Sequence, residues 1–172
     1  ELIKSILERH RVKYETCATV DLPVRERMHR LCGADAVPPL ALIGRRVVWT
    51  APQMPELEAS GELRRVIDRE RRARLARDEY KWGRLYLHGD GARLRADPVV
   101  AREWLRRSAS KGDPKGQCAL ATLLLTGRGG VTDAAEARRW FEAAAVQGSA
   151  SAHLGLGEMD LARYARLAPG LA

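Results

Sequence analysis

The sequence has few of the residue patterns that mark redox enzymes, metal sites or membrane spans. Its three cysteines, Cys17, Cys32 and Cys118, are widely spaced, and no Cys-x-x-Cys pair occurs. This argues against a disulfide framework and predicts free thiols in an intracellular, reducing compartment. The four histidines are scattered, so no metal site is predicted. No apolar run approaches the roughly 18 residues that span a bilayer, so membrane insertion is not expected.

The composition nevertheless suits a folded chain. Of the 172 residues, 45% are hydrophobic, although only one is phenylalanine. This apolar fraction is enough for a buried core and excludes a wholly disordered chain. Residues 1–10 have the pattern of an amphipathic helix that begins at the first residue, with no capping residue before it. This pattern indicates a fragment of a longer protein.

The net charge of +8 lies almost entirely in the second part of the chain. Residues 1–68 carry 11 basic and 10 acidic side chains, whereas residues 69–172 carry 19 and 12. This asymmetry is compatible with an acidic protein partner or a nucleic acid. Charge alone does not distinguish an acidic protein from a nucleic acid as the partner. Cytoplasm, an organelle matrix and a cytoskeletal structure all stay open as locations.

The first third of the chain alternates between helical and strand patterns. β-branched and aromatic residues indicate strands, and a glycine-containing pair, Gly44-Arg45, indicates a hairpin turn. The expected order is a helix to about residue 11, a strand at 12–20, a helix at 23–33, strands at 40–43 and 46–49, a helix at 53–59 and another helix from residue 60.

Three segments of this region resemble the glutaredoxin-like branch of the thioredoxin fold. Residues 36–38, Ala-Val-Pro, stand where that family has Thr-Val-Pro. Residues 40–48, LALIGRRVV, resemble its VFIxGxxI hairpin, and residues 57–63, LEASGEL, resemble its LxxSGEL helix entry. The resemblance implies a partial thioredoxin-like domain whose first strand and cysteine motif would lie before Glu1.

The rest of the chain repeats itself with a period of about 36 residues. Residues 104–112, WLRRSASKG, align with residues 140–148, WFEAAAVQG, and residues 85–91, LYLHGDG, align with residues 123–129, LLLTGRG. Each unit predicts two helices, a Gly-x-Gly turn between them and a second glycine after the second helix. Small residues where helices approach, with one large side chain between them, are typical of a helical-hairpin solenoid.

This pattern is similar to the Sel1-like repeats, which are relatives of the tetratricopeptide (TPR) repeat. Their motif, LGxxYxxGxGVxxDxxEAxxWYxxAAxxGxxxA, is matched over residues 82–112 and again over residues 120–148. The resemblance implies protein–protein interaction, because such repeats commonly serve as adaptors.

The predicted fold class is therefore α/β plus all-α. A glutaredoxin-like domain is expected over residues 1–67, and an α-helical-hairpin solenoid over residues 68–172. Within the solenoid, we expect repeats at about 70–112 and 113–148. A partial third repeat at 149–165 would cap the stack.

A retained thiol or glutathione site finds little support in the sequence. Cys17 falls within a predicted strand and Cys32 at a helix end, so neither lies at the helix N-terminus that lowers a thiol pKa. The stretch that matches the family's glycine-rich ligand turn ends in Pro52, which has no N–H to offer. Val37 and Pro38 are therefore interpreted as vestigial ligand-loop positions. No catalytic residue, cofactor or metal is predicted.

An arginine-rich segment is expected on the helix that joins the two domains. Such density favours contact with an acidic protein or with RNA. Asp68, Glu70 and Asp78 interrupt the run, which favours instead a solvated helix with local ion pairs. The seven candidate contact residues are Arg64, Arg65, Arg69, Arg71, Arg72, Arg74 and Arg77.

The tryptophans and glycines of the repeat region have structural interpretations. Trp82, Trp104 and Trp140 stand at motif positions where packing between helices is expected rather than a binding hot spot. The Gly-x-Gly segments at 89–91 and 127–129 are turns and not phosphate loops, because no strand precedes them and no Lys-Ser/Thr follows. The concave face of the repeats is the better candidate for a partner site.

The predicted function is a non-catalytic scaffold or adaptor that binds proteins as one subunit of a larger assembly. A second hypothesis is a thiol-disulfide oxidoreductase or glutathione-binding protein whose cysteine lies upstream of residue 1. A third is a basic subunit of a ribonucleoprotein that contacts RNA through residues 64–77. The sequence names no partner and no oligomeric state.

Overall fold

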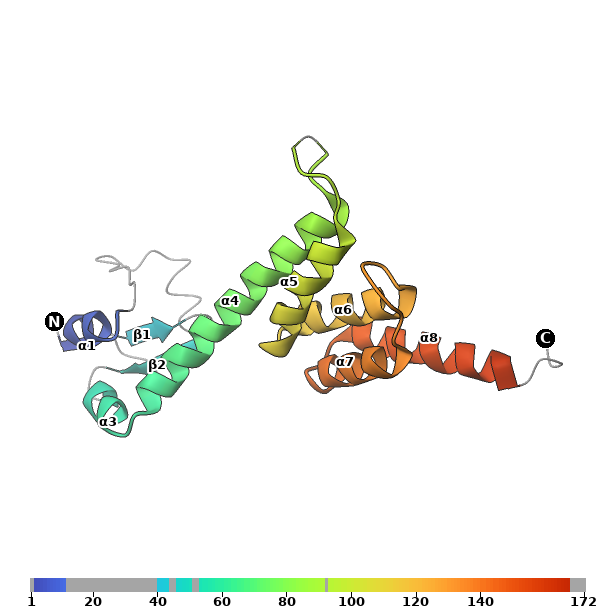
Figure 1. The fold of residues 1–172 in the computed structure, drawn as a ribbon. Helices are drawn as coiled ribbons and strands as arrows, with labels where there is room; N and C mark the ends of the chain where they lie inside the picture. Colours follow the sequence, from blue (N-terminus) through green and yellow to red (C-terminus); the bar gives the residue numbers. More distant parts are fainter. Residues whose placement is uncertain (1, 12–39, 44–45, 51–52, 92, 168–172) are drawn as a thin grey trace, which may run out of the picture. The chain divides into compact units, whose positions relative to one another are not determined.

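The computed structural model describes residues 2–11, 40–43, 46–50, 53–91 and 93–167 (Figure 1). The chain divides into two compact units, unit 1 (Glu1–Arg71) and unit 2 (Arg72–Ala172). Helix α4, Glu62–His88, crosses the boundary between them.

Unit 1 combines helices with one β-hairpin. Its elements are α1 (Leu2–Arg9), β1 (Leu40–Ile43), β2 (Arg46–Thr50), α3 (Met54–Ala59) and the first part of α4. The strands are antiparallel, with Leu40 opposite Thr50 and Ile43 opposite Arg46. A small apolar cluster joins the helices through Ile6, Leu7, Met54, Leu63 and Ile67.

The hairpin lies where the sequence predicts it, but the described residues of unit 1 do not support a thioredoxin-like domain. They contain a single two-stranded sheet. A short hairpin followed by helices occurs in many folds, so local resemblance does not fix the architecture. The predicted strand at 12–20, the predicted helix at 23–33, and Val37 and Pro38 lie outside the described residues.

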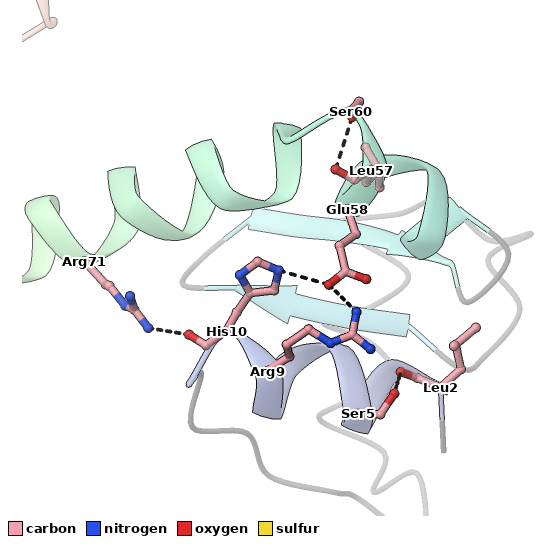
Figure 2. A network of polar contacts seen from close by, with 8 residues as sticks. All are labelled: Leu2, Ser5, Arg9, His10, Leu57, Glu58, Ser60 and Arg71. Atoms are coloured by element: carbon pink, nitrogen blue, oxygen red, sulfur yellow. Dashed lines mark hydrogen bonds and ion pairs between the residues drawn. The ribbon is translucent and has the colours of Figure 1, made fainter.

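Polar contacts in unit 1 tie the end of α1 to α3 and α4 (Figure 2). Arg9 Nη1 donates to Glu58 Oε1 at 2.8 Å, and His10 Nε2 lies 3.3 Å from the same oxygen without hydrogen-bond geometry. Arg71 Nη2 donates to the carbonyl oxygens of His10 at 2.6 Å and Arg11 at 3.2 Å. A cation is favoured there because carbonyls at a helix C-terminus lack intrahelical donors.

Unit 2 consists of stacked helical hairpins, and its described elements are all helices. The second part of α4 is followed by α5 (Pro98–Ser110), α6 (Pro114–Thr126), α7 (Ala134–Val146) and α8 (Ala150–Leu167). We call α4, α6 and α8 the A helices and α5 and α7 the B helices. Each of α5, α6 and α7 packs on the helix that follows it. The predicted solenoid of helix pairs is confirmed.

Local signals set the ends of these helices. Asp97, Asp113 and Asp133 are N-caps whose carboxylates accept hydrogen bonds from backbone N–H groups of the first turn. Gly127, in the left-handed conformation with φ of 70°, ends α6. Arg163 occupies the equivalent position 36 residues later, and α8 continues past it, so α8 is longer than α6.

Small residues allow the A and B helices to approach closely. A Cβ atom at Gly83 of α4 would lie 2.6 Å from Leu105 Cγ of α5, and one at Gly155 of α8 would lie 2.5 Å from Phe141 Cζ of α7. The resulting core is continuous across the hairpins. Its buried members are Leu105, Ala109, Leu120, Ala121, Leu123, Leu124, Ala137, Phe141, Ala144 and Ala152.

A polar link between the A and B helices recurs in both repeats with different chemistry. In the first repeat, Lys111 Nζ donates to both carboxylate oxygens of Glu79 at 2.6 and 2.7 Å, and Glu79 is buried. In the second repeat, Gln147 Nε2 donates to Gln117 Oε1 at 2.9 Å. Lys111 and Gln147 are 36 residues apart, so the same contact is made once by an ion pair and once by two neutral amides.

Candidate protein-binding groove

The A helices of unit 2 line an open groove with a volume of about 460 Å³. Tyr80 contributes from α4, and Phe141 contributes from α7. The remaining lining residues come from α6, from α8 and from Ser149, which directly precedes α8.

The groove is built from matched positions of consecutive repeats. Four lining residues of α6 have their equivalents 36 residues later among the lining residues of α8. The pairs are Lys115 with Ser151, Cys118 with Leu154, Ala119 with Gly155, and Thr122 with Glu158. The repeat therefore presents the same face of successive A helices side by side.

The lining is mixed in chemistry. Leu154 is 66% exposed and offers an apolar surface, while Lys115 and Glu158 are exposed charges of opposite sign. Hydroxyl groups come from Tyr80 and Thr122, and the Thr122 hydroxyl donates to a backbone carbonyl of its own helix. This set suits recognition of a peptide by apolar contact, hydrogen bonds and charge.

The groove does not present the arrangement that nucleophilic catalysis uses. Cys118 Sγ lies 3.4 Å from Ser149 Oγ, and a hydroxyl is not a general base. In the part of the chain that the structure describes, no three His, Cys, Asp or Glu side chains gather as metal ligands. Nor is any helix in the described ranges long and apolar enough to cross a membrane.

The seven candidate arginines all lie on α4 with exposed side chains. The guanidinium groups of Arg64 and Arg71 each approach Asp68 at 4.0 Å, and Arg71 also binds the carbonyls at the end of α1. Arg65, Arg69 and Arg72 share one side of α4, because they are four and three residues apart. Arg71 thus also ties the end of α1 to α4 within unit 1.

Local charge also acts on a carboxylate of α4. Lys81 Nζ donates to Asp78 Oδ1 at 3.0 Å, and this hydrogen bond holds the pKa of Asp78 below its ordinary value. The positive charges of Lys81, Arg74 and Arg77 act in the same direction.

The tryptophan prediction is wrong for Trp82, whose side chain is 50% exposed. Leu120, its equivalent in the second repeat, is buried in the core with Leu105 of the preceding B helix. Within unit 2 no B helix precedes α4, which leaves Trp82 uncovered. Its ring lies 6.5 Å from that of Trp104, and Arg107 stacks over Trp104 at 5.2 Å.

Four groove residues do not stand out in the sequence. Lys115, Thr122, Leu154 and Glu158 fall outside the glycine, alanine and tryptophan positions of the repeat motif. The feature of the sequence that could have located them is the 36-residue period, because it places exposed positions of one A helix beside the equivalent positions of the next.

Helical hairpins stacked through glycine and alanine define unit 2 as a helical-hairpin solenoid. Residues 76–113 and 114–149 each match the family model of the Sel1 repeat. Neither this match nor the described fold supports the glutaredoxin-like domain expected over residues 1–67.

Among solved structures, the chain is similar to a Sel1 repeat protein from Oxalobacter formigenes. The two are 30% identical, with a TM-score of 0.46, and the match covers 49% of this chain and 62% of that chain. This chain thus spans less than two thirds of that relative. No curated protein matches the chain.

Proposed function

We propose that unit 2 is a non-catalytic protein-binding module that holds an extended segment of a partner protein in the groove of the A helices. The observation that carries this proposal is the groove itself, which equivalent positions of α6 and α8 line together. Sel1 repeats generally mediate protein–protein interaction, which supports the same proposal. A rigid stack provides a long surface that needs no catalytic residue.

The lining suggests the character of the bound segment. An apolar side chain of the partner would cover Leu154, while one acidic and one basic group would face Lys115 and Glu158 respectively. Opposite charges in one groove fix the direction in which a peptide binds, because the reversed peptide would place like charges together. The proposed ligand is therefore a peptide with separated acidic and basic residues around an apolar side chain.

A peptide-display selection against the immobilised chain tests this function. Selected peptides should bind the wild-type chain and bind Thr122→Trp at least about tenfold more weakly, because the indole fills the groove. Val131→Trp is the matched control, since Val131 is 82% exposed and does not line the groove. Peptides that bind Thr122→Trp as tightly as wild type would contradict the proposal.

We further propose that the module acts as a scaffold within a larger assembly in a reducing compartment. The thiol of Cys118 is free, which is compatible with such a compartment. Mass measurement of the native complex in cell extract would test the assembly. A chain that migrates alone at physiological concentration would contradict it.

Two other functions stay predictions. A basic ribonucleoprotein subunit would use the exposed arginines of α4. Its affinity for RNA should fall as the salt concentration rises, and replacing the arginines of residues 64–77 by glutamine should abolish binding. For an oxidoreductase or glutathione-binding protein, Cys17, Cys32, Val37 and Pro38 all lie outside the described residues. A disulfide-reduction assay on the longest natural form of the chain would decide that case.

A further inference from the structure

Trp82 of α4 and the pair of Trp104 and Arg107 on α5 form an exposed aromatic site in unit 2. The two indole rings have centroids 6.5 Å apart and planes tilted by 34°, and the Arg107 guanidinium lies 5.2 Å from the centroid of the Trp104 ring. Half of the Trp82 side chain is exposed, and Arg107 is exposed as well. An indole ring and a guanidinium plane are both surfaces on which a flat, unsaturated group stacks.

The second repeat does not reproduce the aromatic site. Leu120 takes the place of Trp82 and is fully buried, and Ala143 takes the place of Arg107. The lack of a preceding B helix explains why position 82 is exposed, but it does not explain why a tryptophan stands there. The second repeat is built without an indole or an arginine at these positions, so packing of the helices does not require them.

Positive charge is concentrated beside the aromatic site. Asp78 lies one helical turn before Trp82 on the same side of α4. Exposed cations that act on this carboxylate outnumber it; they are Lys81, Arg74 and Arg77. Residues 72–113 carry 11 basic and 6 acidic side chains, whereas residues 114–149 carry 4 and 3. The charge therefore favours an anionic ligand at the first repeat.

We propose that the aromatic site binds single-stranded RNA, with a base stacked on Trp82 and phosphates on the neighbouring cations. A single strand carries unpaired flat bases and one negative charge per nucleotide, which match an exposed ring beside cations. Bases of a duplex stack on one another, so duplex DNA does not offer them to the ring. An acidic protein segment would match the cations but would not need the indole.

The aromatic site is separate from the groove. Tyr80 lines the groove, and Trp82 follows it by two residues, which turns the two side chains to nearly opposite sides of α4. The ribonucleoprotein function named above would thus have a defined site. A substitution at Trp82 tests this site alone, because it leaves the arginines of residues 64–77 in place.

The probe is a fluorescent uridine strand of about 12 nucleotides, a length typical of such sites. Its affinity for the full chain is measured by fluorescence anisotropy at several salt concentrations. Trp82→Leu should weaken binding at least about fivefold, because one stacked base is lost. The slope of log affinity against log salt should stay unchanged, because leucine removes no positive charge.

Matched variants and probes isolate the stacking contact. Trp82→Phe keeps an aromatic ring and should bind the strand at least about threefold more tightly than Trp82→Leu. Both variants should fold, since the position is exposed and leucine fills its equivalent at residue 120, and circular dichroism checks this. A duplex RNA should bind more weakly than the single strand. Thr122→Trp, which fills the groove, should leave RNA binding unchanged.

Several results would overturn the proposal. Absence of binding at low salt, or equal affinity of wild type and Trp82→Leu, would remove the stacked base. A duplex RNA bound as tightly as the single strand would leave a charge effect alone. A thymidine DNA strand bound more tightly than the RNA would make DNA the ligand, and polyglutamate bound more tightly than the RNA would make it an acidic protein. Failure of the groove proposal leaves these readouts unaffected, because Trp82 and Arg107 do not line the groove.

Discussion

Two glycines of α8, two residues apart, allow the packing of unit 2 to be tested with a single methyl group. Gly155 is buried, and an added Cβ would lie 2.5, 2.6 and 2.9 Å from three atoms of the Phe141 ring. Gly157 lies in the same helix and has nothing within 4 Å of an added Cβ. Substitution by alanine therefore has the same effect on the backbone at both sites but differs in its steric effect.

The magnitudes follow from these contacts. Alanine in place of glycine inside a helix stabilises it by roughly 0.5–1 kcal/mol, so Gly157→Ala should raise the free energy of unfolding by about that amount. At Gly155 the same gain is opposed by overpacking, which costs typically about 1–3 kcal/mol in a close-packed core. The ring of Phe141 is buried, so making room for the methyl group disturbs its packing. We therefore expect Gly155→Ala to be about 1–3 kcal/mol less stable than Gly157→Ala.

Urea unfolding measures this difference. Tryptophan fluorescence reports mainly on unit 2, which holds Trp82, Trp104 and Trp140, and far-UV circular dichroism should give the same midpoint if the unit unfolds in one step. Adding Phe141→Leu to Gly155→Ala should recover part of the loss, because the smaller side chain makes room for the methyl group. Equal stability of the two alanine variants would refute the close approach of α7 and α8.

Three further predictions concern polar contacts. Lys111→Met should lower the free energy of unfolding by about 1–3 kcal/mol, because it leaves the buried carboxylate of Glu79 without its partner. Changing both residues to glutamine should restore most of that loss in the urea midpoint, since the second repeat uses two amides at this place. Arg71→Gln should speed hydrogen exchange at the end of α1, and unchanged exchange would show that its bonds to the carbonyls are not made in solution. Lys81→Gln should raise the pKa of Asp78, which is lowered in the folded chain, toward its ordinary value in an NMR titration. A lowered pKa means that this carboxylate stabilises the fold above its unfolded pKa and that the contribution is lost as the pH falls through the folded value. An Asp78 titration that is unaffected by the substitution would show that Lys81 is not its partner.

The sequence by itself determined the helical hairpins of unit 2. Aspartate N-caps, turn glycines and the 36-residue period act over one or two helical turns, so each can be read without knowledge of the rest of the fold. The β-hairpin around Gly44 is equally local, and its strands lie at the predicted residues. The thioredoxin-like architecture inferred from such local matches is not supported, because the pairing of distant strands is not encoded in a short motif.

Only the tertiary structure decided which side chains are covered. Trp82 follows the repeat motif yet is half exposed, because no B helix precedes α4 within unit 2. Arg71 looks like its six arginine neighbours in the sequence, but it alone reaches the carbonyls at the end of α1. The groove likewise depends on which helix lies beside which. Burial and contact are properties of neighbours in space, and neighbours 36 residues or more apart in the chain are set by packing rather than by local sequence.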